Sequence, residues 1–181
     1  MRLATILITA AATAALASCG SAADEPTPAT SPATTSAEQA DAAQGEECVA
    51  EDFTVAGDKG QAPDVTVPDD CSAPTELLIE DVEAGSGAEV TAGDTAEVHY
   101  QLVGFSDGGK LDSSWERGES FPVENVGNAP VIDGWNEGLI GMKEGARRLL
   151  VVPPELGYGA SPGHQLAEET LVFVVDLKKV S

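Results

Sequence analysis

Five aromatic side chains come from five separate segments of a chain in which aromatic residues make up only 4% of the sequence. They are Tyr100, Phe121, Trp135, Tyr158 and Phe173. Aromatic rings from separate segments can form a shared core, or they can form the walls of an apolar pocket that excludes water. Trp135 raises this question most directly, because it follows Val131 and Ile132 in the stretch "VIDGWNEGL". Considered one at a time, the residues favour a shared core.

Other catalytic chemistry has little support in the sequence. Ser-His-Asp chemistry needs a positioned base, but the chain has two histidines, His99 within a predicted strand and His164 in a predicted loop. No nucleophile elbow or phosphate-binding loop accompanies them, and the glycine-flanked "GMKEG" at residues 141–145 is predicted to be a turn. We expect the abundant carboxylates to be solvated surface groups, not acid–base pairs.

Length and charge restrict the classes of partner. The 181 residues have room for one ordinary domain with extensions. Thirty-one Asp and Glu against nine Lys and Arg give a formal charge of −22, which would repel the phosphates of a nucleic acid and anionic lipid headgroups. Nucleic acid is therefore excluded as a partner, and any membrane attachment must come from a source other than a basic patch.

The first residues have the pattern of an export signal. Arg2 is followed by an apolar run from Leu3 to Leu16, which is too short for a spanning helix. "LASC" at residues 16–19 looks like a bacterial lipobox, which implies cleavage after residue 18 and lipid on Cys19. The alternative is an ordinary cleaved signal with an incidental cysteine. We expect a protein outside the cytoplasm that is lipid-anchored to the bacterial cell membrane.

Two segments separate this signal from the compact domain. Residues 19–47 are rich in Pro, Ala, Ser, Thr and acids, a composition that predicts a disordered tether. Residues 48–73 are predicted to be a short extended arm with turns. Cys48 and Cys71 flank this arm, and in an exported protein a structural disulfide is favoured over free thiols. The two cysteines lack a nearby His or Cys-x-x-Cys spacing, so we expect no metal or redox site.

Residues 74–181 are predicted to form the folded domain. Alternating and β-branched runs predict strands within residues 75–85, 95–105, 146–153 and 170–180. One helix is predicted to begin at Asp133 as its N-cap and to end near Gly141. Several strands with one short helix predict an α+β fold, in which an antiparallel sheet curls over the helix.

The motifs around the aromatic residues favour the pocket. "VHYQLVGF", "GGKLDSSWERGESFPV", "PVIDGWNEGLIGMKEGARRLLVVPPELGYG" and "TLVFVVDL" occur in the order, and nearly at the spacing, of the FKBP-type peptidyl-prolyl isomerases. Residues 77–181 resemble this family almost from end to end. The resemblance implies an antiparallel half-barrel sheet around a short helix and an aromatic pocket. It assigns Trp135 as the floor, Tyr100, Phe121, Tyr158 and Phe173 as walls, Val131 and Ile132 as the rim, and Asp112 as the pocket carboxylate.

The activity that this resemblance implies is rotation about X–Pro peptide bonds without a metal or a cofactor. Trp135 would support the proline ring, while Tyr158 and the backbone NH of Ile132 would bind substrate carbonyls. Three roles stay open for Asp112: orienting Tyr100, polarising the amide, or serving as a buried acceptor. Expected partners are proline-containing clients and macrolides such as rapamycin. A tethered proline-binding chaperone with little isomerase activity is the alternative, whereas a two-lobed solute-binding protein does not fit the size.

The sequence departs from the family pattern at three places. Leu111 stands where the family usually has an aromatic residue, so we expect it to form a reduced part of the substrate-binding wall. The stretch "YQLVGFSDGGKL" is one residue longer than in compact members. The loop "ASPGHQLAEE" lacks the Ile-Pro-Pro that commonly precedes "TLVF", and we expect Leu166 to take the place of the isoleucine. His164 in this loop is expected to be exposed.

Overall fold

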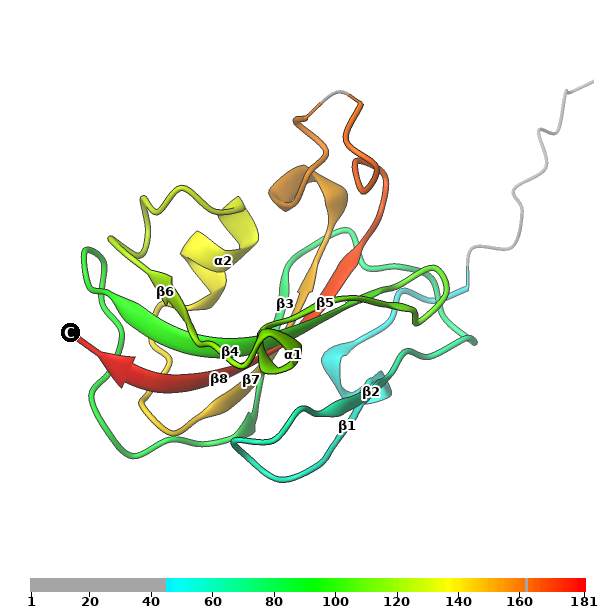
Figure 1. The fold of residues 1–181 in the computed structure, drawn as a ribbon. Helices are drawn as coiled ribbons and strands as arrows, with labels where there is room; N and C mark the ends of the chain where they lie inside the picture. Colours follow the sequence, from blue (N-terminus) through cyan, green and yellow to red (C-terminus); the bar gives the residue numbers. More distant parts are fainter. Residues whose placement is uncertain (1–44, 162) are drawn as a thin grey trace, which may run out of the picture. The chain divides into compact units, whose positions relative to one another are not determined.

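A computed structural model describes residues 45–161 and 163–181 (Figure 1). The predicted signal peptide at residues 1–18, the lipidation site Cys19 and almost all of the predicted tether lie outside the described residues. Among the helices of the described part, none is long and apolar enough to cross a membrane.

An antiparallel sheet of six strands forms the centre of the fold. Its strands are β3 (Leu78–Glu83), β4 (Ala96–Gly104), β5 (Lys110–Ser113), β6 (Phe121–Val123), β7 (Arg147–Val152) and β8 (Leu171–Val180). The order is β3-β7-β8-β4-β5, and β6 pairs with β4 on the edge that also pairs with β5, opposite β8. The central strand β8 is buried on both faces from Leu171 to Leu177, as its Val-rich sequence requires. The predicted antiparallel α+β fold is confirmed.

The helix α2 (Asp133–Gly138) packs on the inner face of this sheet (Figure 1). Two glycines bring its backbone close to β7: a Cβ at Gly134 would lie 2.5 Å from Val152, and one at Gly138 would lie 2.7 Å from Leu150. This close approach buries Trp135, which is 4% exposed.

The predicted ends of this helix were wrong by one to three residues. The N-cap is Ile132, not Asp133, because the carbonyl of Ile132 already accepts the backbone NH of Trp135. The helix ends at Gly138, and Gly141 then reverses the chain with a φ of +77°.

Several short elements were not predicted. The helix α1 (Ser114–Arg117) is a single turn that follows β5 and ends at Gly118, whose φ is +71°. The 3₁₀ helices η1 (Ala50–Asp52) and η2 (Pro154–Leu156) are shorter still. Elements of three or four residues carry too little periodicity to be recognised in a sequence.

The outer face of the sheet is covered by residues 48–73, which form a small hairpin. Its strands are β1 (Thr54–Ala56) and β2 (Asp64–Thr66), and they pair antiparallel. Phe53 and Cys48 pack against buried side chains on the outer face of the sheet. These are Val103, Leu149, Val151, Val172 and Val174. The segment is therefore a packed layer, where the sequence predicted an extended arm.

Polar contacts and a disulfide also fix the hairpin. The guanidinium of Arg147, which is fully buried, donates to the carbonyl oxygens of Gly57, Asp58 and Gln61 at 2.7–3.2 Å. The same guanidinium pairs with Asp176 at 2.6 Å. Cys48 and Cys71 are bonded to each other, as predicted, with their Cα atoms 5.1 Å apart.

Candidate active site

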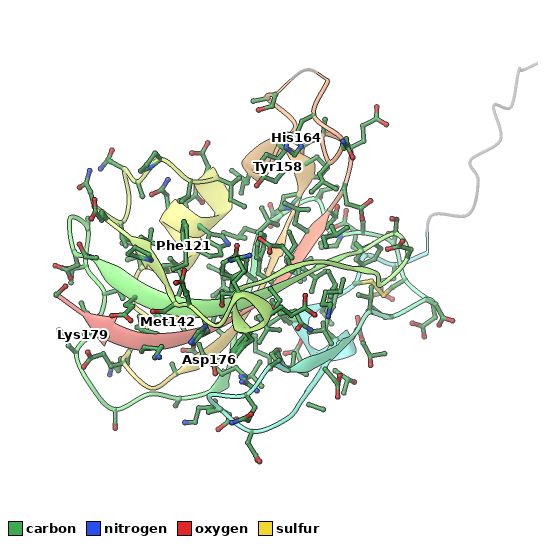
Figure 2. All side chains as sticks on the ribbon, in the orientation of Figure 1. Phe121, Met142, Tyr158, His164, Asp176 and Lys179 are labelled. Carbon is green, nitrogen blue, oxygen red and sulfur yellow. A yellow bond between two sulfur atoms is a disulfide. The ribbon has the colours of Figure 1, made fainter. Side chains whose placement is uncertain are left out.

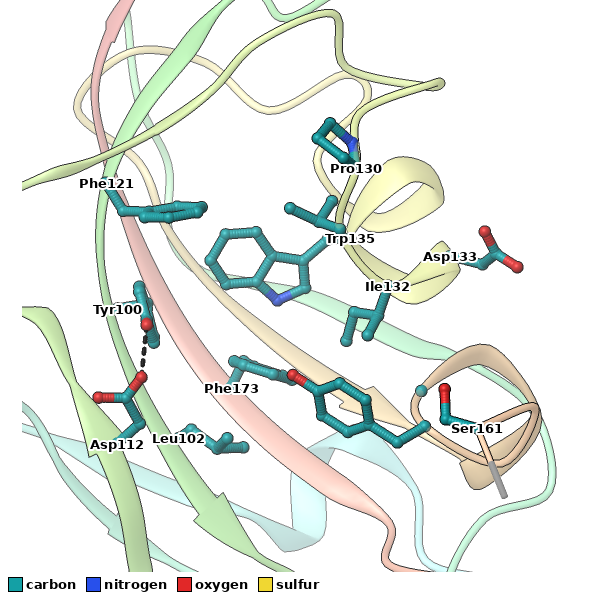
Figure 3. A pocket seen from close by; sticks show the side chains of 13 residues that line it. Tyr100, Leu102, Asp112, Phe121, Pro130, Ile132, Asp133, Trp135, Ser161 and Phe173 are labelled. Atoms are coloured by element: carbon teal, nitrogen blue, oxygen red, sulfur yellow. Dashed lines mark hydrogen bonds between the residues drawn. The ribbon is translucent and has the colours of Figure 1, made fainter. Parts of the chain in front are cut away.

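A cavity of about 480 Å³ lies on the helix side of the sheet (Figure 3). Figure 2 shows Phe121 and Tyr158 on this side, while Asp176 lies toward the hairpin. The lining side chains come from β4, β5, β6, β8, α2 and the segments before α2 and after η2. They are Tyr100, Leu102, Asp112, Phe121, Pro130, Val131, Ile132, Asp133, Trp135, Gly157, Tyr158, Ser161 and Phe173. All five aromatic residues singled out in the sequence therefore meet at one cavity.

Trp135 is the centre of the aromatic cluster. Its ring centroid lies 5.2 Å from that of Tyr100, 5.3 Å from that of Phe173 and 6.0 Å from that of Phe121, with interplanar angles of 74–85°. These edge-to-face contacts are the favoured geometry for aromatic pairs. Within the described residues, the indole Nε1 of Trp135 is buried and has no hydrogen-bond partner. The indole thus presents an almost entirely apolar surface to the cavity.

Strand alternation explains why the walls converge. On β4, Tyr100 and Leu102 face the cavity, whereas Gln101 between them points outward and donates to the carbonyl oxygen of Pro63 in the hairpin at 2.7 Å. On β8, Phe173 faces inward while Val172 and Val174 pack under the hairpin. Each of these strands therefore serves the cavity with one face and the outer layer with the other.

A polar network lies at one wall of the cavity. The hydroxyl of Tyr100 donates to Oδ2 of Asp112 at 2.6 Å, as Figure 3 shows. The other carboxylate oxygen, Oδ1, accepts the backbone NH of Ser113 at 2.7 Å and the guanidinium of Arg117. Arg117 also donates to the Tyr100 hydroxyl at 2.8 Å and lies over the Tyr100 ring. The carboxylate of Asp112 is thus engaged at both oxygens.

This network shifts the titration of its members. Partial burial raises the pKa of Asp112, but the hydrogen bonds from Tyr100 and Ser113 and the charge of Arg117 outweigh it, so the net pKa is lowered. Burial raises the pKa of Tyr100, and its bond to Asp112 acts in the same direction. At neutral pH the pair is therefore an ionised carboxylate that accepts a hydrogen bond from a neutral phenol.

Arg117 was missed by the sequence reasoning. It lies on α1, five residues after Asp112 in "DSSWER", and a one-turn helix after the strand brings the two side chains together. The signal available in the sequence was a basic residue about one turn beyond the pocket carboxylate, but the turn itself was not predicted.

Two further lining residues, Ile132 and Tyr158, come from the start of α2 and from the segment after η2. Ile132 caps α2 with its carbonyl, and the residue itself lines the cavity. Across the cavity, the ring of Tyr158 stacks on that of His164, with centroids 4.0 Å apart and an interplanar angle of 16°. The backbone NH of Leu166 donates to Nδ1 of His164 at 3.2 Å. His164 is exposed, as expected, and it supports a wall residue.

The site holds the groups for non-covalent recognition. The other histidine, His99, lies outside the cavity lining, and its Nδ1 is 2.9 Å from the hydroxyl of Ser114. Aromatic rings surround the space, and the polar side chains that line it are those of Tyr100, Tyr158, Ser161, Asp112 and Asp133. Such an arrangement can bind a compact apolar ring and orient an adjacent carbonyl.

The family's sequence model, described as FKBP-type peptidyl-prolyl cis-trans isomerase, matches residues 87–178. These residues contain every wall of the cavity. The chain belongs to the FKBP-type peptidyl-prolyl cis-trans isomerase family. The family membership that the motifs implied is thereby confirmed.

The segments of two FKBP relatives that match this chain cover most of each relative's own length. A "Probable FK506-binding protein" of Corynebacterium glutamicum is 47% identical over 108 residues, which are 58% of this chain and 87% of the relative. An "FK506-binding protein" of Streptomyces anulatus is 42% identical over 123 residues, which are 66% of this chain and 98% of the relative. The crystal structure of FkpA from Escherichia coli aligns with a TM-score of 0.52 and 39% identity over 59% of this chain, but over 49% of that chain. The present chain thus matches about half the length of the FkpA chain.

Two residues expected to contact substrate in this FKBP domain lie outside the cavity lining. Leu111 is 43% exposed, and it falls at an irregularity of the β4–β5 pairing, where Leu102 pairs with Asp112 and Val103 with Lys110. Leu111 is left without a partner at this irregularity, where the usual alternation of faces is interrupted, and its side chain is not among those that line the cavity. Leu166 packs, partly buried, against the inner core instead of lining the cavity. The expectation that these two side chains form walls is not supported.

Other lining residues of the FKBP cavity had no predicted role: Leu102, Pro130, Asp133, Gly157 and Ser161. Leu102 could have been inferred from its position two residues after Tyr100 on the same strand face. Ser161 lies on the loop that lacks the family's usual pattern, so its position carried no signal in the sequence.

Proposed function

We propose that this FKBP domain catalyses cis–trans isomerisation of X–Pro peptide bonds in proteins outside the cytoplasm. The observation that carries the proposal is the cavity floored by Trp135 and walled by Tyr100, Phe121 and Phe173 in a chain of this family. Its volume has room for a proline-containing segment, and its aromatic walls suit the proline ring.

The reaction needs rotation about a partial double bond and breaks no covalent bond. The barrier is roughly 18–20 kcal/mol, so the uncatalysed step takes tens of seconds or longer. In the twisted transition state amide resonance is lost and the bond becomes less polar. A dry apolar cavity favours this state over the planar ground state, which is differential binding of the transition state.

Each group has a role in this mechanism. Trp135 supports the proline ring through its apolar indole face. Tyr100, Phe121 and Phe173 enclose the ring and exclude water. The backbone NH of Ile132 and the hydroxyl of Tyr158 donate hydrogen bonds to substrate carbonyls.

Asp112 acts through Tyr100 in our account. Both of its oxygens are engaged, Oδ2 by Tyr100 and Oδ1 by Ser113 and Arg117. A carboxylate held in this way fixes the phenol of Tyr100 and keeps that wall in place. Of the three roles that the sequence left open, this contact pattern favours orientation of Tyr100.

We also propose that the protein acts while tethered to the membrane by lipid on Cys19. The support is the sequence at residues 1–19 and the disulfide between Cys48 and Cys71, which is typical of proteins that fold outside the cytoplasm. A Cys19→Ala variant should lose incorporation of labelled fatty acid and leave the membrane fraction. Unchanged fractionation of this variant would refute the lipid anchor.

The catalytic proposal is tested by the isomerisation rate of a short X–Pro peptide with protein from residue 20 onward, with and without a macrolide. Two relatives are named FK506-binding proteins, so we expect FK506 or rapamycin to occupy the cavity and abolish the acceleration. A folded protein that binds the macrolide but does not accelerate the peptide would be a proline-binding chaperone. Phe121, which is 36% exposed beside the cavity, would then serve client binding.

A further inference from the structure

The side chain of Asn136 joins the helix α2 to the start of the segment that forms one cavity wall. The backbone NH of Ala129 donates to Oδ1 of Asn136 at 2.9 Å, and Nδ2 of Asn136 donates to the carbonyl oxygen of Ala129 at 3.1 Å. One amide therefore pairs with both backbone groups of a residue seven positions earlier. Neither the family resemblance nor the strand and helix patterns gave Asn136 a role.

The segment between these two residues carries the rim of the site. Residues 130–132 all line the cavity. Its far end is held by the helix, because the carbonyl of Ile132 accepts the backbone NH groups of Trp135 at 3.0 Å and Asn136 at 3.3 Å. Its near end, at the buried Ala129, is held by the Asn136 side chain. The wall is thus a short bridge with both ends attached to the helix that bears the floor.

The helix needs such support. It has six residues, and its N-cap, Ile132, makes no side-chain capping bond. A helix of this length has little stability of its own and takes its position from its contacts. Asn136 lies directly beside Trp135, so the amide fixes the wall relative to the tryptophan floor.

We propose that Asn136 is a positioning residue, which sets the distance from the Ile132 NH and the Val131 wall to Trp135 and thereby the affinity for the proline-containing ligand. This inference rests on the proposed function of the cavity. The two bonds require an acceptor and a donor on one short side chain, which an amide supplies. An ionised carboxylate would accept from the Ala129 NH but would place negative charge beside the Ala129 carbonyl oxygen.

Three variants of the protein from residue 20 onward test this role. Asn136→Ala removes both bonds, and Asn136→Asp keeps the shape but loses the donor at neutral pH. Asn128→Ala is the matched control, because Asn128 is exposed in the same loop, next to Ala129. We expect Asn136→Ala and Asn136→Asp to lower kcat/KM for an X–Pro peptide and to weaken macrolide affinity by roughly tenfold at pH 7, per folded molecule. Asn128→Ala should match the parent in both.

The pH profile of Asn136→Asp separates positioning from a general loss of stability. A protonated Asp side chain again offers one donor and one acceptor. As the pH falls through about 4, the ordinary pKa of Asp, the ratio of variant to parent macrolide affinity should rise toward one. Asn136→Ala should keep its deficit throughout. Hydrogen exchange of the Ala129 NH, which donates to Oδ1 of Asn136, should be faster in Asn136→Ala at pH 7.

The outcomes distinguish the two proposals. If the parent neither accelerates the peptide nor binds the macrolide, the proposed function of the cavity fails. If the parent does both and the two Asn136 variants match it at pH 7, Asn136 has no positioning role. If Asn136→Ala does not fold, the pH profile of the isosteric Asn136→Asp decides: recovery at low pH supports positioning, and a flat deficit or no deficit refutes it.

Discussion

The two faces of the sheet are covered in opposite ways, although the same strands supply both. On the inner face, α2 and the aromatic side chains leave a cavity of about 480 Å³ above Trp135. On the outer face, the hairpin of residues 48–73 covers a row of valines, and a fully buried Arg147 fixes it. Tyr100 and Phe173 on the inner face alternate with Gln101 and Val174 on the outer face. The inner face, here called the open face, is therefore free to receive a ligand, whereas the outer face, here called the closed face, is packed against the hairpin.

The largest effect on stability should come from breaking the Arg147–Asp176 ion pair on the closed face. In Asp176→Ala, Arg147 loses its carboxylate while it stays buried, and the backbone NH of Gly60 loses its acceptor. We expect a loss of about 3–5 kcal/mol in the free energy of unfolding, measured by urea denaturation. The control is Glu89→Ala, which removes a half-exposed partner of Lys143 and should cost less than about 1 kcal/mol. Equal effects of the two variants would show that the hairpin does not depend on this pair.

The disulfide should matter next, and for stability more than for activity. Replacing both Cys48 and Cys71 by Ser opens a loop whose ends are 23 residues apart. The chain-entropy account predicts a loss of about 3 kcal/mol in the free energy of unfolding. Peptide isomerisation per folded molecule should be unchanged, because the disulfide lies on the closed face. If the isomerisation rate falls while the protein stays folded, the hairpin layer affects the shape of the cavity, and the two faces do not act independently.

The smallest effect should be the response of the open face to pH. Because the pKa of Asp112 in the folded protein is lowered, its ionised form contributes stability above the unfolded pKa of about 3.9. That contribution disappears as the pH falls through the lower folded pKa. Both partners of the Asp112–Arg117 pair are more than 40% exposed, so solvent screening keeps the contribution below about 1 kcal/mol.

The activity should follow the same titration. We expect kcat/KM to be constant from pH 8 to pH 5 and to fall only below about pH 4, where Asp112 gains its proton and releases Arg117. Asp112→Asn should remove this acidic limb. If kcat/KM of the parent already declines between pH 7 and pH 5, a group other than Asp112 controls the position of Tyr100.

The elements that the sequence predicted are those of six residues or more: β3, β4, β7, β8 and α2. The run of Val and Leu in β8 and the alternation in β4 are visible because each strand exceeds eight residues. The floor and walls of the site followed from motifs around Trp135 and Tyr100. In contrast, β5, β6 and α1 have three or four residues, and the position of Arg117 depends on that single helical turn.

The ion pairs of Arg147 and Arg148 and the position of Leu111 were beyond the sequence for a different reason. Arg147 and Arg148 are adjacent in a strand, and no local sequence pattern predicts that both side chains are buried. Their carboxylate partners are Asp176 and Asp81, which lie 29 and 67 residues away in the chain. Leu111 was misplaced because the strand irregularity beside it fixes which face it occupies. Long-range pairing and register, not residue type, decided these positions.

The division between a binding face and a supporting face is tested most directly by Trp135→Leu. Leucine keeps much of the buried volume, so the protein should remain folded by circular dichroism and urea denaturation, with a smaller loss than the roughly 3–5 kcal/mol of a large-to-alanine change. The decisive measurement is kcat/KM for an X–Pro peptide. We predict that the folded variant loses most of its isomerase activity and its macrolide affinity, because the floor of the cavity is gone. A folded Trp135→Leu variant that isomerises proline as well as the parent would contradict the account.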